Sequence, residues 1–378
     1  MVTVREVLTK RDMRRFVEFP LKLYKDCPYF VPPIYSDEMK LLVGNPAYSD
    51  VADSALYIAE RDGRVVGRIQ AIIQHQYNEL HNEKRVRFSR FDSIDDTEVS
   101  RALFSAAEKY GRERGMTDIC GPLGYSDLDR EGLLVEGFDY LATFEEQYNY
   151  DYYPRLVEDY GFKKEIDWLE FRLTSPDKPN LLMPKVAERV LEFQGLHIAD
   201  MNMSKKKYIE KYGDGAFACI DECYKHLYGT VPFTENMKRE LIDQFMLVLK
   251  NEHLVFVCDK DERVVAFALS FPAIGEAFQR SGGRLTPATL IRLFRTLKHP
   301  RSIDLGLIAI LPKYQSTGVN AVFMNHVLGV LERGEAEYYE TNLNLETNNQ
   351  VMSQWNYFNA KQHKRRRAYL KKIEEGEN

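Results

Sequence analysis

The sequence predicts a mixed α/β protein built as two tandem domains of the same kind. Strand-like and helix-like segments alternate along the whole chain, and both halves contain a hairpin followed by further elements in the same order. The spacing is also similar, since Leu56 and Val255 in the two hairpins lie 199 residues apart, and Trp168 and Tyr369 in the two closing strands lie 201 apart. This pattern indicates a duplicated domain of about 175 to 195 residues. Two unrelated α/β domains in tandem are the alternative.

The chain length and one polar segment give the predicted domain boundaries. With 378 residues the chain exceeds one ordinary domain. The segment 174–180 is short, polar and punctuated by two prolines, as linkers are. We therefore expect one domain at 1–175, a linker at 176–182 and a second domain at 183–378.

In the first half, Asp62 and Gly63 between two apolar runs give a clear hairpin signal. Apolar residues spaced by three and four predict an amphipathic helix that ends near Gly115, and Gly161 ends another helix. In chain order we expect a strand at 2–7, a helical stretch at 10–26 bent near Pro20, strands at 55–60, 64–74 and 84–92, a helix at 98–115, a strand at 116–123, a helix at 152–162 and a strand at 163–173.

The second half repeats this order. Thr234 is a good helix cap, Thr286 and Pro287 a good helix start, and Gly334 a good helix end. In chain order we expect a strand at 196–201, helices at 204–227 and 234–251, strands at 254–259 and 263–271, a helix at 286–299, a strand at 302–311, a helix at 321–334, a strand at 336–346, a helix at 349–360 and a final strand at 364–373.

Composition excludes several classes of protein. Asp and Glu outnumber Lys and Arg by 57 to 52, so a general surface for nucleic acid is not expected. The basic run Lys364–Arg367 is interpreted as a charged edge strand, and contact with an acidic substrate or a coenzyme phosphate is the alternative. No apolar run approaches the ~20 residues of a membrane span, and the N-terminus lacks the apolar core of a secretory signal. Five scattered cysteines predict free thiols without a disulfide or metal site, and hence a cytoplasmic protein.

The most informative stretch is the strand–loop–helix junction at 303–334. An apolar strand runs into a short polar loop with Gln315, Ser316, Thr317 and Gly318, and a helix begins immediately afterwards. Such a loop can direct free backbone N–H groups at an anion over the positive end of the helix dipole. The junction therefore predicts a phosphate-binding site.

The residues of this junction resemble a known motif. The run AILPKYQSTGVNA at 309–321 resembles the coenzyme A-binding motif of GCN5-related N-acetyltransferases, in which V-x-P-x-[YF] leads into [QR]-x-x-G-x-[GA]. Gln315 and Gly318 match, whereas Asn320 stands where the family has a second small residue, with Ala321 just behind it. The resemblance implies two tandem domains of this fold, each a mixed, mainly antiparallel sheet flanked by helices.

Two further segments resemble bacterial tandem acetyltransferase-like proteins. They are GPLGYS at 121–126 and GLLVEGF at 132–138. Together the resemblances imply transfer of an acetyl or longer acyl group from coenzyme A to a small-molecule amine or an amino-acid-like acceptor. The residues that they imply for binding acetyl-CoA or another acyl-CoA are Ile308, Ala309, Ile310, Gln315, Ser316, Thr317, Gly318, Val319, Asn320 and Asn348.

The first half fits the fold but not this chemistry. Its equivalent junction at 91–98 has no glycine and carries Asp92, Asp95, Asp96 and Glu98 where a pyrophosphate would lie. Like charges repel strongly when partly desolvated, although an acidic helix start is itself ordinary. We therefore expect the first half to bind no coenzyme A there.

Two residues are candidates for the acid and the base of the acyl transfer. The family pattern N-x-x-A-x-x-x-Y places a tyrosine seven residues after an asparagine, and counting from Asn348 gives Trp355. Counting from Asn349 gives Asn356, so Tyr357 is off register by one or two positions, each of which is nearly 100 degrees of helix turn. Tyr357 is either the acid or a packing residue. Glu346 at a strand end is a candidate base, directly or through water, or an exposed carboxylate.

The segment 121–160 contains seven tyrosines in a loop longer than a structural connection requires. Tyr125, Tyr152 and Tyr153 are predicted to line the acceptor pocket, and packing is the alternative.

Two other functions compete with that of an acyltransferase. One is a non-catalytic coenzyme A-binding or ligand-binding protein, and the other is a tRNA-dependent aminoacyl transferase, which the acidic charge disfavours.

Overall fold

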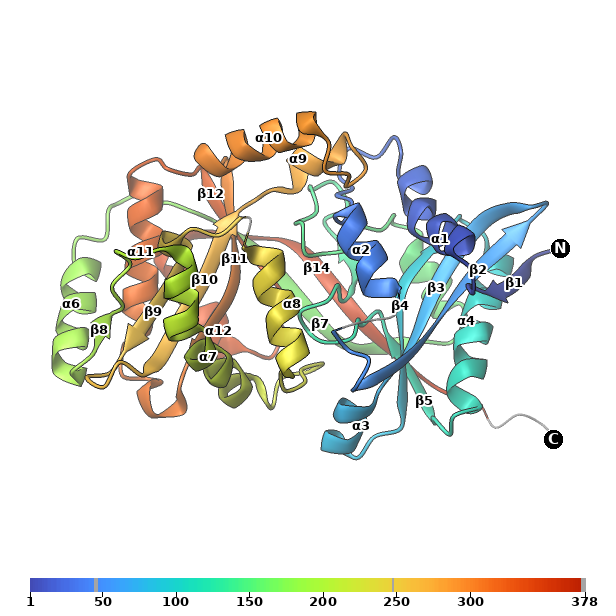
Figure 1. Ribbon diagram of the computed structural model, residues 1–378, viewed down its shortest axis with the longest axis horizontal. Helices are drawn as coiled ribbons and strands as arrows, with labels where there is room; N and C mark the ends of the chain where they lie inside the picture. Colours follow the sequence, from blue (N-terminus) through green and yellow to red (C-terminus); the bar gives the residue numbers. More distant parts are fainter. Residues whose placement is uncertain (44–46, 247, 375–378) are drawn as a thin grey trace. The chain divides into compact units, whose positions relative to one another are not determined.

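The computed structural model describes residues 1–43, 47–246 and 248–374 (Figure 1). It divides into two compact units, which we describe separately. Unit 1 comprises residues 1–169, 275–293 and the chain from 363 onward, and unit 2 comprises 170–274 and 294–362. Among the helices of the described ranges, none is long and apolar enough to cross a membrane.

Unit 1 is a mainly antiparallel sheet with the long helix α4 packed against it. In its sheet the strands follow the order β1-β2-β3-β4-β5-β14-β7, and only β4 and β5 among the described pairs there run parallel. Its elements are β1 (Thr3–Glu6), α1 (Lys10–Leu23), α2 (Tyr35–Leu42), β2 (Ala52–Arg61), β3 (Arg64–Gln74), α3 (His75–His81), β4 (Arg85–Ser93), α4 (Thr97–Arg112), β5 (Asp118–Gly121), β6 (Leu133–Glu136), α5 (Tyr153–Glu158), α9 (Gly275–Gln279) and parts of β7 (Lys163–Thr174), α10 (Pro287–Lys298) and β14 (Asn359–Lys372).

Unit 2 has the same kind of sheet, in the order β7-β12-β11-β10-β9-β8. Strands β11 and β12 form its parallel pair, from Ser302 opposite Tyr338 to Leu305 opposite Thr341. Its elements are α6 (Met183–Gln194), β8 (His197–Ile198), α7 (Lys205–Tyr224), α8 (Glu235–Phe245), η1 (Asn251–His253), β9 (Leu254–Cys258), β10 (Val264–Pro272), β11 (Ser302–Ile310), η2 (Pro312–Tyr314), α11 (Asn320–Glu332), β12 (Tyr338–Thr341), β13 (Asn344–Leu345), α12 (Asn349–Met352) and η3 (Ser353–Tyr357).

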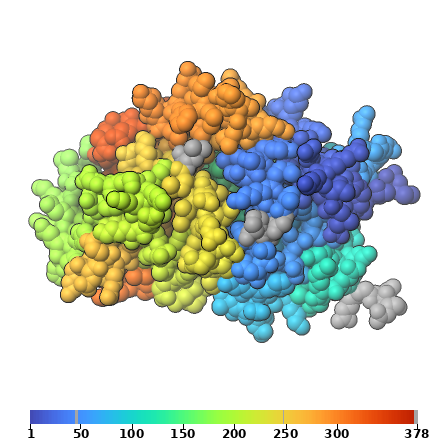
Figure 2. All heavy atoms as spheres, viewed as in Figure 1, coloured from blue at the N-terminus to red at the C-terminus, as the bar shows by residue number. Residues whose placement is uncertain are grey.

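Both faces of the unit 2 sheet are covered. Helix α11 packs with one set of alternate strand residues, including Val255 and Ala266, and helix α7 packs with the other set, including Phe256 and Phe267. In the space-filling view, the α7 and α8 segments (green to yellow) form much of the visible surface of this unit (Figure 2). The predicted mixed α/β architecture with mainly antiparallel sheets is confirmed.

The compact units do not coincide with the two sequence halves, because the closing strands β7 and β14 are shared between the units. Residues 369–372 of β14 pair with β5 in unit 1, whereas Arg172 and Leu173 of β7 pair with β12 in unit 2. Each half thus supplies a strand that completes the sheet begun by the other half. The boundary at 176–182 stays a prediction about the sequence repeat.

Two local predictions differ from the structure. The run Lys364–Arg367 is not an edge strand, because β14 lies between β5 and β7. There the guanidinium groups of Arg365 and Arg367 bond the buried carboxylate of Asp167 at 2.8 to 3.1 Å. The helix expected at 349–360 is a single α-turn, α12, followed by the 3₁₀ turn η3, and β14 begins at Asn359.

Candidate functional site

The polar loop of unit 2 is held in one conformation by its own side chains. The Gln315 amide nitrogen donates to the Ile310 carbonyl at 2.9 Å, and the Thr317 hydroxyl donates to the Tyr314 carbonyl at 2.7 Å. Ser316 and Gly318 have positive φ angles of 60 and 91 degrees, and the second of these favours glycine. A Cβ added at Gly318 would lie 3.1 Å from a methyl group of Val190. The loop is therefore rigid and tightly fitted to α6.

This loop presents backbone donors at the start of the 13-residue helix α11. Within residues 1–43, 47–246 and 248–374, the backbone N–H groups of Ser316, Gly318, Val319 and Asn320 bond no carbonyl. Unbonded N–H groups at a helix start carry partial positive charge, which the helix dipole reinforces. The loop can therefore bind an anion through its backbone.

A groove of about 500 Å³ runs from this loop along the end of β11. It is bounded by β11, the loop, the C-terminal end of α7 and the α12–η3 turn. Eight of the ten residues predicted to bind the coenzyme line it; Thr317 and Gly318 do not line it but lie in the loop itself. The lining ones are Ile308, Ala309, Ile310, Gln315, Ser316, Val319, Asn320 and Asn348.

The groove exists because β11 leaves β12. Their pairing ends at Leu305 and Thr341, and on its other side β11 shifts register against β10, so that Gly306 has no partner there. Past this bulge the Tyr224 hydroxyl donates to the Ile308 carbonyl at 2.9 Å. Tyr224 is the last residue of α7, and its side chain lines the groove where the two strands separate.

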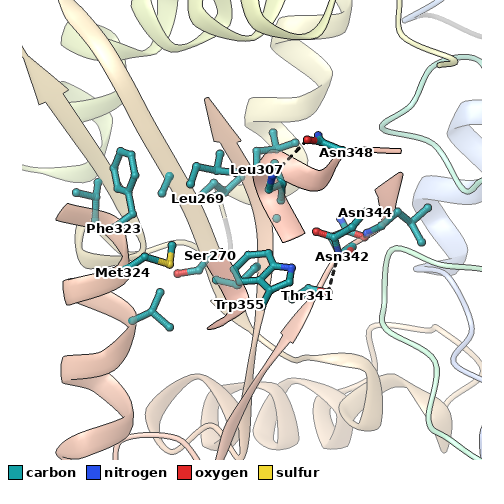
Figure 3. A pocket seen from close by; sticks show the side chains of 18 of the residues that line it. Leu269, Ser270, Leu307, Phe323, Met324, Thr341, Asn342, Asn344, Asn348 and Trp355 are labelled. Carbon is teal, nitrogen blue, oxygen red and sulfur yellow. Dashed lines mark hydrogen bonds between the residues drawn. The ribbon is translucent and has the colours of Figure 1, made fainter. Parts of the chain in front are cut away.

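A second cavity, of about 160 Å³, lies beside the groove. It passes between the sheet and α11, and it shares Tyr224, Ile308 and Asn348 with the groove. Figure 3 shows Phe323 and Met324 of α11 at one end and the asparagines of the β12–α12 segment at the other. No Asp, Glu, Lys or Arg is among the residues that line it. The cavity therefore has one apolar end and one polar end.

Two buried polar atoms at these sites have no hydrogen-bond partner among the described residues. They are the side-chain amide oxygen (Oε1) of Gln354, which lines the groove, and the indole N–H of Trp355, whose ring lines the cavity. A buried polar atom without a partner costs about 1 to 3 kcal/mol. A ligand with a donor for Gln354 and an acceptor for Trp355 would remove that cost.

The two histidines at the apolar end are neutral at physiological pH. Burial lowers the pKa of His253 to about 4, and burial also lowers the pKa of His326. The His253 Nδ1 atom accepts a hydrogen bond from the Lys250 backbone at 3.3 Å. Neither ring therefore adds charge to the cavity.

The predicted acid and base do not line either space. Tyr357 is 41% exposed at the end of η3, and Glu346 lies between Leu345 and Thr347, both of which line the groove. Their catalytic roles stay predictions. Sequence reasoning passed over Tyr224, and it reached Trp355 only as the residue seven positions after Asn348.

In unit 1 the equivalent junction is filled by internal contacts. Asp92 is buried and accepts hydrogen bonds from Arg68 at 2.7 Å and Tyr24 at 2.9 Å. Asp96 caps α4 by accepting the Glu98 N–H at 2.8 Å, and its bond to Arg61 lowers the pKa of its carboxyl. These two carboxylates are therefore engaged by neighbouring arginines, a tyrosine and a backbone N–H group, and the expectation that no coenzyme A binds here stays a prediction.

The three tyrosines predicted as an acceptor wall lie in unit 1. Tyr125 is buried and accepts from the Gln70 amide at 2.7 Å, and Tyr153 is buried and bonds the Tyr24 hydroxyl at 2.7 Å. Tyr152 is half-buried and donates to the Ser93 carbonyl at 2.8 Å. These contacts give all three a packing role in unit 1, and their role toward an acceptor stays a prediction.

The chain is similar in sequence to known bacterial proteins. No protein-family model matches the chain. Protein YghO of Escherichia coli (strain K12) is 27% identical over 98% of this chain and 95% of its own. The bacterial ceramide synthase of Caulobacter vibrioides is 26% identical over 84% of this chain and 82% of its own.

Among solved structures, a tandem GNAT protein from the clavulanic acid biosynthesis pathway aligns with 100% of both chains at a TM-score of 0.60 and 9% identity. At that identity the likeness shows the fold. The resemblance seen at 309–321 is thus confirmed at the level of architecture. The chain has the tandem fold of the GCN5-related N-acetyltransferases.

Proposed function

We propose that the protein is an N-acyltransferase that takes an acyl group from coenzyme A, bound by unit 2, and transfers it to an amine. The observation that carries the proposal is the set of N–H groups at Ser316 and at residues 318–320 that bond no carbonyl of the described residues, at the head of a groove that leads to the separation of β11 and β12. A pyrophosphate needs such donors, and an extended arm needs such a groove.

The groove residues fit the rest of a coenzyme A molecule. The pyrophosphate would accept from the loop N–H groups, and the amide N–H groups of the pantetheine arm would donate to the unpartnered Gln354 oxygen and to neighbouring carbonyls. The thioester would then lie where the groove meets the cavity, beside Tyr224 and Ile308. These fits support acetyl-CoA or another acyl-CoA as the co-substrate.

At this junction the side chains can assist acyl transfer. The amine nitrogen forms a bond to the carbonyl carbon, the carbon–sulfur bond breaks, the nitrogen loses a proton, and the thiolate gains one. Tyr224 carries the hydroxyl best placed to donate that proton. The Trp355 N–H, which has no hydrogen-bond partner among the described residues, can donate to the carbonyl oxygen as negative charge develops on it.

The acceptor class is proposed from the chemistry and from one relative. A ceramide is an amide of a long-chain amino alcohol, so the name of the Caulobacter relative describes amide formation. We extend this reaction class to the present chain as transfer to a primary amine. A non-catalytic coenzyme A-binding protein is the second candidate, since Tyr357 does not line the groove.

A direct test combines calorimetry with a thiol-release assay. We expect coenzyme A to bind with one site per chain, because the junction in unit 1 is filled. With acyl-CoA and a panel of primary amines, amine-dependent release of free thiol is expected. Binding without amine-dependent release supports the non-catalytic alternative, and absence of binding contradicts both.

A further inference from the structure

We propose that the apolar cavity between the unit 2 sheet and α11 holds the acyl chain of the thioester, and that it selects chains of about six to eight carbons. The inference rests on the proposed function, and it names the acyl donor that the proposed function leaves open. Three features of the cavity carry it: the lining residues that it shares with the groove, its apolar inner walls and its size.

The cavity and the groove are neighbours with part of their lining in common. They share Tyr224, Ile308 and Asn348, which stand where β11 separates from β12. A thioester at this junction has its sulfur toward the groove, so its alkyl chain continues into the cavity. Because the chain is tethered to the bound coenzyme, it enters at high effective concentration.

The lining suits an alkyl chain better than an amine. From the junction inward the walls are side chains such as Ala268, Leu305, Phe323, Met324 and Val327. The lining includes no carboxylate, and burial holds the pKa of His253 near 4, so an ammonium group would find no counter-charge there. An amine acceptor must therefore approach the carbonyl from outside this cavity.

The size sets the expected chain length. An engineered apolar cavity of about 150 Å³ holds one benzene molecule, which has six carbons. The present cavity measures about 160 Å³. Chains of about six to eight carbons, including the carbonyl carbon at the mouth, would fill it, and longer chains would have to displace side chains.

Ala268 has one of the small side chains on the sheet wall of the cavity. It is half-buried on β10, on the face that packs with α11, and its small side chain lines the cavity. A phenylalanine at this position would occupy the space of several methylene groups. The Ala268→Phe variant should therefore shorten the accepted chain without touching the groove.

The experiment measures kcat/KM for saturated acyl-CoA donors of two to sixteen carbons with one fixed amine. In the wild type we expect a rise of about fourfold per added methylene up to about eight carbons, since each buried methylene contributes about 0.8 kcal/mol. In Ala268→Phe the eight-carbon donor should lose at least about fiftyfold, with the two-carbon donor changed less than about twofold. Ala360→Phe, at an exposed position of β14 in the same unit, is the matched control and should leave the profile unchanged.

Met324→Ala is the reciprocal variant, because it widens the inner end and should shift the optimum to longer chains. It keeps the proposal testable if Ala268→Phe does not fold. A flat wild-type profile in an enzyme that binds coenzyme A overturns the acyl-chain assignment alone. So does an Ala268→Phe variant that changes the dependence on amine length but not on acyl length. Failure of the wild type to bind coenzyme A itself overturns the proposed function as well.

Discussion

The Gly318→Glu variant is expected to lose at least about a hundredfold in affinity for coenzyme A, which corresponds to about 2.7 kcal/mol. Gly318 lies between the N–H groups of residues 316 and 319–320. Its φ of 91 degrees is one that residues with a Cβ atom rarely adopt. Glutamate adds bulk against Val190 and a negative charge beside the pyrophosphate. Both effects act on binding, and charge-assisted hydrogen bonds contribute about 1.5 to 3 kcal/mol each.

Isothermal calorimetry with coenzyme A measures this loss, and circular dichroism checks the fold. Gly334→Glu is the matched control, because Gly334 also has a positive φ and lies just beyond the opposite end of α11, with open space around its Cα. It should bind as the wild type does. Gly318→Ala separates bulk from charge and should lose about tenfold or less. Unchanged binding by Gly318→Glu would mean that the pyrophosphate lies elsewhere.

The Tyr224→Phe variant is expected to lower kcat by about a hundredfold while the dissociation constant for coenzyme A changes less than about threefold. The hydroxyl lies 2.9 Å from the Ile308 carbonyl, at the junction proposed for the thioester. Phenylalanine keeps the ring packing but cannot donate a proton to the leaving thiolate. A loss in kcat without a loss in binding is the signature of an interaction made in the transition state.

Tyr357→Phe is the comparison that decides between two assignments. Tyr357 is the candidate acid from the sequence, although it is off register with the family motif, whereas the groove favours Tyr224. Since Tyr357 is 41% exposed and lines neither space, its variant should keep wild-type kcat. If Tyr357→Phe loses activity and Tyr224→Phe does not, the result supports Tyr357 as the acid and contradicts the role proposed for Tyr224.

Much of the polar loop at 315–320 could be predicted from the sequence because its signals are local. A strand, a polar loop with Gly318 and a helix start follow one another within 303–334, so their neighbours in space are also neighbours in the chain. The same holds for the hairpin at Asp62 and Gly63, which connects β2 and β3.

The rest of the site depends on distant contacts and on local departures from regular helix. Tyr224 reaches Ile308 from 84 residues away, and no periodicity in α7 indicates that approach. The segment after Asn348 forms a 3₁₀ turn rather than a continuous helix, so an α-helical count could not place Gln354 and Trp355 correctly. The strands β7 and β14 illustrate the same limit, because strand patterning alone does not specify the partner strand.

The most direct test of the account is a crystal structure with a non-reactive thioether analogue of octanoyl-CoA. The account predicts one molecule per chain, with its pyrophosphate on the N–H groups of residues 316–320 and its sulfur beside Tyr224. The octyl chain should lie between the unit 2 sheet and α11, in contact with Ala268 and Met324. Coenzyme density at the 91–98 junction of unit 1, or a pyrophosphate away from the 315–320 loop, would contradict it.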